Sequence, residues 1–255
     1  MALVVEHDGA VAVVTLDNGP LNLLTMADRA ELVAVAGRLR DDRGTRAIVL
    51  AGAGPKAFCA GSDVNEFPAG PEAGRERARR EHACYAAVAA LPQPVVAALH
   101  GHVLGGGVEL ALACDIRVAD ATARLGLPEV TLGLFPSGGG SQRLPRLIGA
   151  SRAKELMFLG GTVGADEAAR LGIVDHVVDA GRATEHARGL AAEIAARPAL
   201  AVRAIKAAVD VGLDDGMVVG TALEERLIGE LFASHDAHEG VAALLARRPP
   251  HFEHR

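Results

Sequence analysis

The stretch that most constrains this chain runs from an apolar segment, Val95–Leu99, through the glycine triplet Gly105–Gly107 into residues with helical character. Because glycine has no Cβ, backbone N–H groups in such a turn can meet a ligand closely. A helix that opens just after the triplet adds unpaired amides and the positive end of its dipole. Glu109 falls within the first turn of that helix. The stretch therefore predicts a site that joins N–H donors for a developing negative charge with a carboxylate for proton transfer.

Short apolar segments alternate with helical periodicity through most of the chain. Ala47–Ala51 and Val95–Leu99 are wholly apolar, which is typical of strands buried on both faces of a parallel sheet. We expect helices that begin after Thr25, that cover residues 71–90 and that cover residues 151–159. This alternation favours an α/β fold with right-handed crossovers.

The end of the chain has a different pattern. From Thr184 onward it is helical almost throughout. Breaks are expected at Pro198, at Gly212 to Gly216 and at Gly240. We therefore expect an α/β core over residues 1–190 and a helical C-terminal region over residues 191–255.

Composition limits the classes of function. The chain has 255 residues and a net charge of −6, which argues against a nucleic-acid binder, although a local basic site for an anionic ligand stays open. Three cysteines without CxxC spacing predict reduced thiols and a cytoplasmic location. Met1–Gly9 lacks the basic-then-apolar layout of a signal peptide. No uncharged apolar run reaches the roughly 18 residues that would predict a membrane span.

Several common kinds of site lack their sequence motifs. No G-x-G-x-x-G pattern fits over Gly101–Ala113, and no Gly-Lys-Ser/Thr follows the triplet, so a nucleotide-cofactor loop is disfavoured. His100 and His102 have no third ligand nearby at metal-binding spacing. Ser62 and Ser137 lack the G-x-S-x-G context of a serine nucleophile. We therefore expect neither a metal nor a dinucleotide cofactor.

Two carboxylates stand in unusual surroundings. Glu109 lies in an otherwise apolar helix, where it is either a functional group or the buried partner of an arginine such as Arg117. Glu129 follows a proline in an apolar segment and is open to the reading of an ordinary loop carboxylate. Together, two carboxylates beside glycine-rich turns are what proton addition and removal at a weakly acidic carbon require.

Several motifs in order resemble the crotonase (enoyl-CoA hydratase/isomerase) superfamily. They are Phe58–Glu66, the glycine triplet with Glu109, Pro128–Glu129, Phe135–Leu144, and the end segments around Asn22, Asp236, Glu239–Gly240 and Arg247–Pro249. The resemblance spans nearly the whole chain. It implies an α/β spiral of repeated ββα units, followed by helices that support trimerisation, usually as a hexamer of two stacked trimers.

The resemblance also implies the chemistry. Substrates are acyl-CoA thioesters, whose carbonyl oxygen binds the backbone N–H groups at Ser62 and Gly106, an oxyanion hole. Loss of one such N–H donor typically lowers the stabilisation of the transition state by roughly 3 kcal/mol. With both glutamates present, hydration of a trans-2-enoyl-CoA to the 3-hydroxyacyl-CoA is favoured, with Glu109 as general base and Glu129 as the proton donor to C2. An isomerase, another acyl-CoA enzyme of the superfamily and a non-catalytic relative are the alternatives.

For the CoA moiety, the resemblance points to the loop from Lys56 to Val64, in which Lys56, Ala60, Asp63 and Val64 are the expected contacts. Coenzyme A belongs to the substrate, so no separate cofactor is implied. A cluster of arginines either screens the CoA phosphates or solvates a helix face: Arg75, Arg77, Arg79 and Arg80. The segment 244–248 departs from the superfamily's pattern where the acyl and adenine pockets are shaped, so chain-length preference stays open.

Overall fold

The computed structural model describes residues 3–255, whose strands form two sheets. The six-stranded sheet has the order β1-β2-β3-β5-β7-β10, parallel except where β1 meets β2. The four-stranded sheet has the order β4-β6-β8-β9, parallel except where β8 meets β9. The strands are β1 (Leu3–Asp8), β2 (Val11–Leu16), β3 (Ala47–Gly52), β4 (Ala57–Cys59), β5 (Val95–Leu99), β6 (His102–Leu104), β7 (Ile116–Asp120), β8 (Arg124–Gly126), β9 (Thr162–Gly164) and β10 (His176–Val178).

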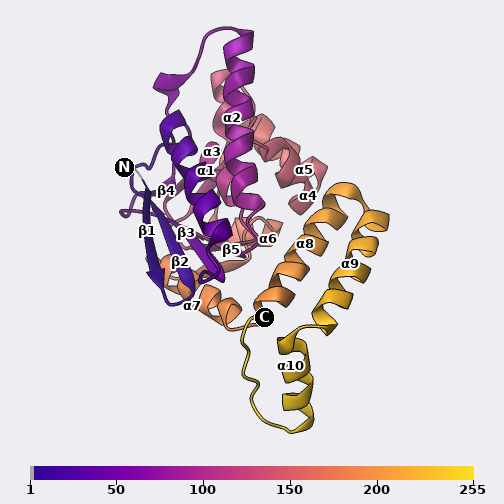
Figure 1. Cartoon of the computed structure of the whole chain (residues 1–255). Coiled ribbons are helices and arrows are strands. Elements are labelled where there is room, and N and C mark those ends of the chain that lie inside the picture. The colour runs from indigo at the N-terminus through magenta and orange to yellow at the C-terminus, as the bar shows by residue number, and fades with distance from the viewer. Residues whose placement is uncertain (1–2) are drawn as a thin grey trace.

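The helices cover the sheets and extend beyond them. The α-helices are α1 (Met26–Asp41), α2 (Pro71–Ala89), α3 (Gly106–Ala111), α4 (Gly140–Ile148), α5 (Ala150–Leu159), α6 (Ala165–Leu171), α7 (Ala183–Ala195), α8 (Ala199–Asp215), α9 (Met217–Phe232) and α10 (His235–Leu245). Two 3-10 segments are η1 (Val64–Glu66) and η2 (Pro128–Leu132). Figure 1 shows α8, α9 and α10 standing to one side of the layered core. Within residues 3–255, none of these helices combines the length and apolarity needed to cross a membrane.

The chain repeats one pattern. A long strand in the large sheet leads to a short strand in the small sheet and then to a helix: β3, β4 and α2, then β5, β6 and α3, then β7, β8 and η2 with α4. Successive long strands are neighbours, and so are successive short strands. Each turn of the chain therefore stacks on the previous one, which confirms the predicted α/β spiral of ββα units.

The central strands bury both of their faces. On β3, Ile48 and Leu50 pack in the core cluster with side chains of α1 and α2, whereas Val49 packs in a second cluster on the opposite face. The alanines of α7 at a four-residue spacing complete that second cluster: Ala183, Ala187, Ala191 and Ala195. This two-sided burial explains the wholly apolar strands. The boundary expected at residue 190 falls inside α7, a helix that covers the sheet.

Of the three expected C-terminal breaks, the one at Gly240 is wrong, and the one at Gly212 to Gly216 is confined to Gly216. Gly212 lies inside α8, where it faces Gly220 of α9, and a Cβ on Gly220 would stand 2.8 Å from the Cα of Gly212. Gly240 lies inside α10, where the ring of Phe252 packs 3.7 Å from the place of its Cβ. Neither glycine ends a helix, and the pair Gly212 and Gly220 allows the close approach of α8 and α9. Pro198 and Gly216 do lie at helix boundaries.

We predict that Thr25→Ala lowers the free energy of unfolding by about 1 kcal/mol, the usual cost of removing an N-cap. Thr25 caps α1: its Oγ1 accepts the N–H of Asp28 at 3.1 Å, and the Asp28 carboxylate accepts the N–H of Thr25 at 2.9 Å. Urea unfolding followed by circular dichroism measures the loss. Thr221→Ala is the control, because its exposed hydroxyl bonds only carbonyls of its own helix. Equal midpoints for the two variants would contradict the role of the cap.

Candidate functional site

Glu109 is buried beside two glycine-rich turns. The helix α3 begins at Gly106, inside the triplet and not after it, and Glu109 is 3 % exposed. Its Oε1 accepts the N–H groups of Gly138 at 2.7 Å and Gly140 at 2.9 Å. The alternative of a buried pair with Arg117 is wrong, because that guanidinium binds Asp175 and nearby carbonyl oxygens.

Burial raises the pKa of Glu109 above its ordinary value, and the amides of Gly140 and Gly138 only partly oppose this rise. The carboxylate is therefore held in one orientation by backbone donors while it remains more basic than an exposed glutamate. This is an environment suited to accepting a proton.

Glu129 reaches the other side of the triplet from η2. Its Oε1 lies 2.9 Å from the place where a Cβ on Gly105 would stand, and its Oε2 is buried without a hydrogen-bond partner among residues 3–255. Burial, followed by the negative charge of Glu109, raises the pKa of Glu129 to about 7. Glu129 is therefore no ordinary solvated loop carboxylate, since it can carry or release a proton near neutral pH.

The structure brings Ser62 and Gly106 together. Ser62 follows β4 and forms an isolated bridge with Leu24, whose N–H and C=O bond the neighbours of Ser62. The Ser62 Oγ lies 3.4 Å from the place of a Cβ on Gly106. Within residues 3–255, no hydrogen-bond acceptor occupies the N–H of either Ser62 or Gly106. Two neighbouring backbone donors are thus left to bind a ligand oxygen.

Three buried polar residues adjoin these donors and were missed by sequence reasoning. Arg29 Nη2 donates to Ser62 Oγ at 2.7 Å and lies 3.3 Å from Glu81 Oε1 and 3.4 Å from the hydroxyl of Tyr85. The sequence did carry one signal for Arg29 and Glu81, which is their position among the apolar residues of a helix. Arg29 shares the apolar stripe of α1 with Leu32, and Glu81 shares the buried face of α2 with Tyr85.

The residues expected to contact CoA lie along one loop. Lys56 is exposed, and Val64 is 56 % exposed. The N–H of Ala60 donates to Leu21 O at 2.9 Å, so only its carbonyl is left for a ligand. Asp63 accepts the N–H of Asn65 at 3.0 Å and caps η1.

The four arginines of α2 lie in two different environments. Three of its members are exposed and pair with glutamates of the same helix: Arg75, Arg79 and Arg80. Arg77 instead turns inward, 3.1 Å from Glu81 Oε1 and 4.6 Å from the centre of the Phe67 ring. Three arginines therefore lie on the exposed face of the helix, and Arg77 belongs to the buried group around Glu81.

Other features take no part in this cluster. His100 contacts the carbonyl of Gly54 at 2.8 Å, and His102 is exposed. No group of three His, Cys, Asp or Glu side chains within residues 3–255 is arranged to hold a metal ion. The three cysteines are free and buried.

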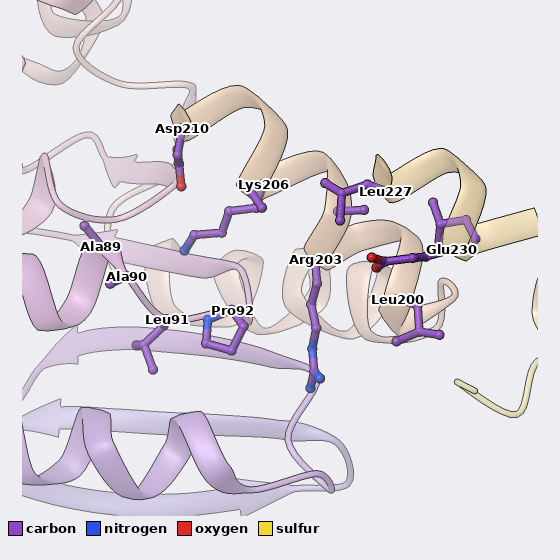
Figure 2. A pocket seen from close by; sticks show the side chains of 13 residues that line it. Ala89, Ala90, Leu91, Pro92, Leu200, Arg203, Lys206, Asp210, Leu227 and Glu230 are labelled. Carbon is purple, nitrogen blue, oxygen red and sulfur yellow. The ribbon is translucent and has the colours of Figure 1, made fainter. Parts of the chain in front are cut away.

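Two cavities separate the C-terminal helices from the core. One of about 390 Å³ lies between α8, α9 and the end of α2, and Lys206 points across it toward the α2–β5 connection (Figure 2). The Nζ of Lys206 forms a salt bridge with Asp115 Oδ2 at 2.8 Å. The other, about 870 Å³, is bordered by α4, α7 and α8. Neither cavity is lined by Glu109 or Glu129.

Comparisons with known proteins agree on the family. The family model for enoyl-CoA hydratase/isomerase matches residues 6–255. The chain is 36 % identical to a short-chain-enoyl-CoA hydratase of Clostridium acetobutylicum over 96 % of this chain and 95 % of that protein. It is 40 % identical to a probable enoyl-CoA hydratase of Rhizobium meliloti over 99 % of this chain and 98 % of that one.

Solved structures give the same result. A crystal structure of an enoyl-CoA hydratase from Bacillus anthracis covers all of both chains with a TM-score of 0.95 at 37 % identity. An enoyl-CoA hydratase from Mycobacterium smegmatis matches with a TM-score of 0.93 at 33 % identity, over 99 % of each chain. These findings confirm the resemblance seen in the sequence motifs. The chain belongs to the enoyl-CoA hydratase/isomerase (crotonase) family.

Proposed function

We propose that this chain is an enoyl-CoA hydratase that adds water reversibly across the 2,3 double bond of a trans-2-enoyl-CoA. The observation that carries the proposal is a pair of carboxylates, Glu109 buried and Glu129 half-buried, on either side of a glycine turn that also offers two unoccupied N–H donors. The names of its relatives support the same activity.

In the proposed mechanism, a water molecule lies between Glu109 and Glu129. Glu109 removes a proton from the water as its oxygen bonds to C3, and the electron pair moves to the thioester oxygen. The N–H groups of Ser62 and Gly106 stabilise this enolate. Glu129 then donates its proton to C2, and solvent exchange returns the proton from Glu109 to Glu129 after product release.

The geometry supports this division of roles. Both hydrogen bonds to Glu109 end on Oε1, so its other oxygen is left for the water. Glu129 has no such donors on its buried Oε2, and its pKa of about 7 makes the protonated form abundant at neutral pH. An isomerase needs one carboxylate to move a proton between C2 and C4, and the presence of two favours hydration.

Substrate and assembly follow from the same proposal. We propose that Lys56, Ala60, Asp63 and Val64 contact the CoA moiety, which the substrate supplies, with no further cofactor. We also propose a homotrimer or a hexamer of two trimers in the cytoplasm. The free cysteines support that compartment.

The C-terminal helical region, residues 191–255, is the proposed oligomerisation surface. Its first residues complete α7, and the helices beyond α7 expose large apolar side chains that a partner subunit would bury. Each of these residues is more than 60 % exposed: Leu213, Met217, Val218, Phe232, Leu244 and Leu245.

Crotonyl-CoA tests the activity directly. Addition of the protein is expected to remove the ultraviolet absorbance of the conjugated thioester as water adds across the double bond. Longer trans-2-enoyl-CoA thioesters extend the assay, because the acyl length is open. No loss of absorbance with short, medium or long thioesters would refute the proposed function.

Replacement of either glutamate by glutamine is expected to slow turnover strongly. Glu109→Gln and Glu129→Gln should each lower kcat at least about a hundredfold, because each removes one partner of acid–base catalysis. Glu193→Gln, which changes an exposed carboxylate of α7, is the matched control and should keep kcat. Near-normal turnover of either site variant would show that its residue has been misassigned.

The pH profile tests the role of Glu129. Because its pKa is about 7, the carboxyl loses its proton above that pH and can no longer donate to C2. The kcat/KM for hydration should therefore fall by about tenfold per pH unit above about pH 7. The residual activity of Glu129→Gln should lack this fall. A flat wild-type profile between about pH 6 and 9 would contradict the assignment.

A further inference from the structure

A buried ion pair beneath the two N–H donors joins α1 to α2. Arg29 is 1 % exposed and Glu81 is 5 % exposed, and Nη2 of the arginine lies 3.3 Å from Oε1 of the glutamate. Replacement of such a pair by apolar side chains of similar volume is often neutral or stabilising. Stability alone therefore gives little reason for charges on the apolar faces of both helices.

Arg29 donates hydrogen bonds both to Ser62 and to Leu24, the residue paired with Ser62. Its Nη1 donates to Leu24 O at 2.7 Å, and its Nη2 donates to Ser62 Oγ at 2.7 Å. Leu24 and Ser62 are paired in an isolated bridge. The planar guanidinium therefore links the backbone of one bridge partner to the side chain of the other, which a single flexible ammonium does less well.

The same group lies behind the second donor. A Cβ on Gly106 would stand 3.3 Å from Arg29 Nη2 and 2.8 Å from the hydroxyl of Tyr85. Arg29 is thus in contact with the surroundings of both N–H donors. Arg77, 3.1 Å from Glu81 Oε1, supports the glutamate from the outer side.

We propose that Arg29 and Glu81 are positioning residues that, through the Ser62 hydroxyl, hold the Ser62 N–H in register with that of Gly106. They touch no substrate and act on the thioester oxygen only through Ser62. This inference rests on the proposed function, because it concerns the oxyanion hole of the same reaction.

The test uses a ligand whose spectrum reports on the carbonyl. The absorption of 4-dimethylaminocinnamoyl-CoA moves to longer wavelength when its thioester carbonyl is polarised by hydrogen bonds. Three variants are compared with the wild type: Ser62→Ala, the apolar pair Arg29→Met with Glu81→Leu, and the combination of all three changes. Arg117→Met is the control, since it removes another buried, ion-paired arginine away from the site.

We expect Ser62→Ala and the apolar pair each to lower kcat by about tenfold, less than the hundred- to thousandfold loss of a whole donor. KM should change less than about threefold, because the contact is made mainly in the transition state. The red shift of the bound probe should shrink in both. The kcat of the triple variant should be no lower than that of the less active of Ser62→Ala and the apolar pair. The reason is that both changes remove the same interaction, the one between Arg29 and the Ser62 hydroxyl. Arg117→Met should keep kcat and the shift.

Two results would overturn the proposal: an undiminished red shift in both Ser62→Ala and the apolar pair, or losses of kcat that multiply in the triple variant. Ser62→Ala keeps the test valid if the apolar pair does not fold. The spectrum needs no turnover. A wild-type protein that shifts the probe but hydrates no enoyl-CoA would therefore refute the hydratase function, and the variants' shifts would still decide the role of the pair.

Discussion

The carbonyl oxygen of Cys59 lies where a Cβ on Gly107 would have to be. Only glycine permits this approach, so the end of β4 meets the start of α3 backbone to backbone. That contact carries Ser62 and Gly106 to the same place with their N–H groups unoccupied. The position of Glu109 one turn further along α3, and of Glu129 beside Gly105, follows from the same arrangement.

The packing that brings the donors together also gives the carboxylates their chemistry. Glu109 is buried and Glu129 is half-buried, and this loss of hydration raises the pKa of each. Glu109 recovers two backbone hydrogen bonds, whereas one oxygen of Glu129 is buried without a partner. One fold thus gives two like carboxyl groups different surroundings: amides hold Glu109, and Glu129 titrates near neutrality, which fits the proposed roles of base and acid.

Local patterns predicted most of the elements well. The wholly apolar runs became β3 and β5, and the cap at Thr25 became the start of α1. Glycine predicted helix ends less well. A glycine lies at a helix boundary at Gly216, but at Gly212 a glycine allows two helices to pack closely. No helix was expected over α4, whose first residue is a glycine and which contains Pro145.

The sequence by itself determined the alternation of apolar strands with helices, the glycine turn and the two glutamates, because periodicity and short motifs are properties of neighbouring residues. Only the tertiary structure decided that Glu109 is held by Gly138 and Gly140, and that Arg29 meets Glu81 under Ser62. These partners come from separate turns of the spiral. Their pairing depends on how the turns stack, and no local pattern contains that information.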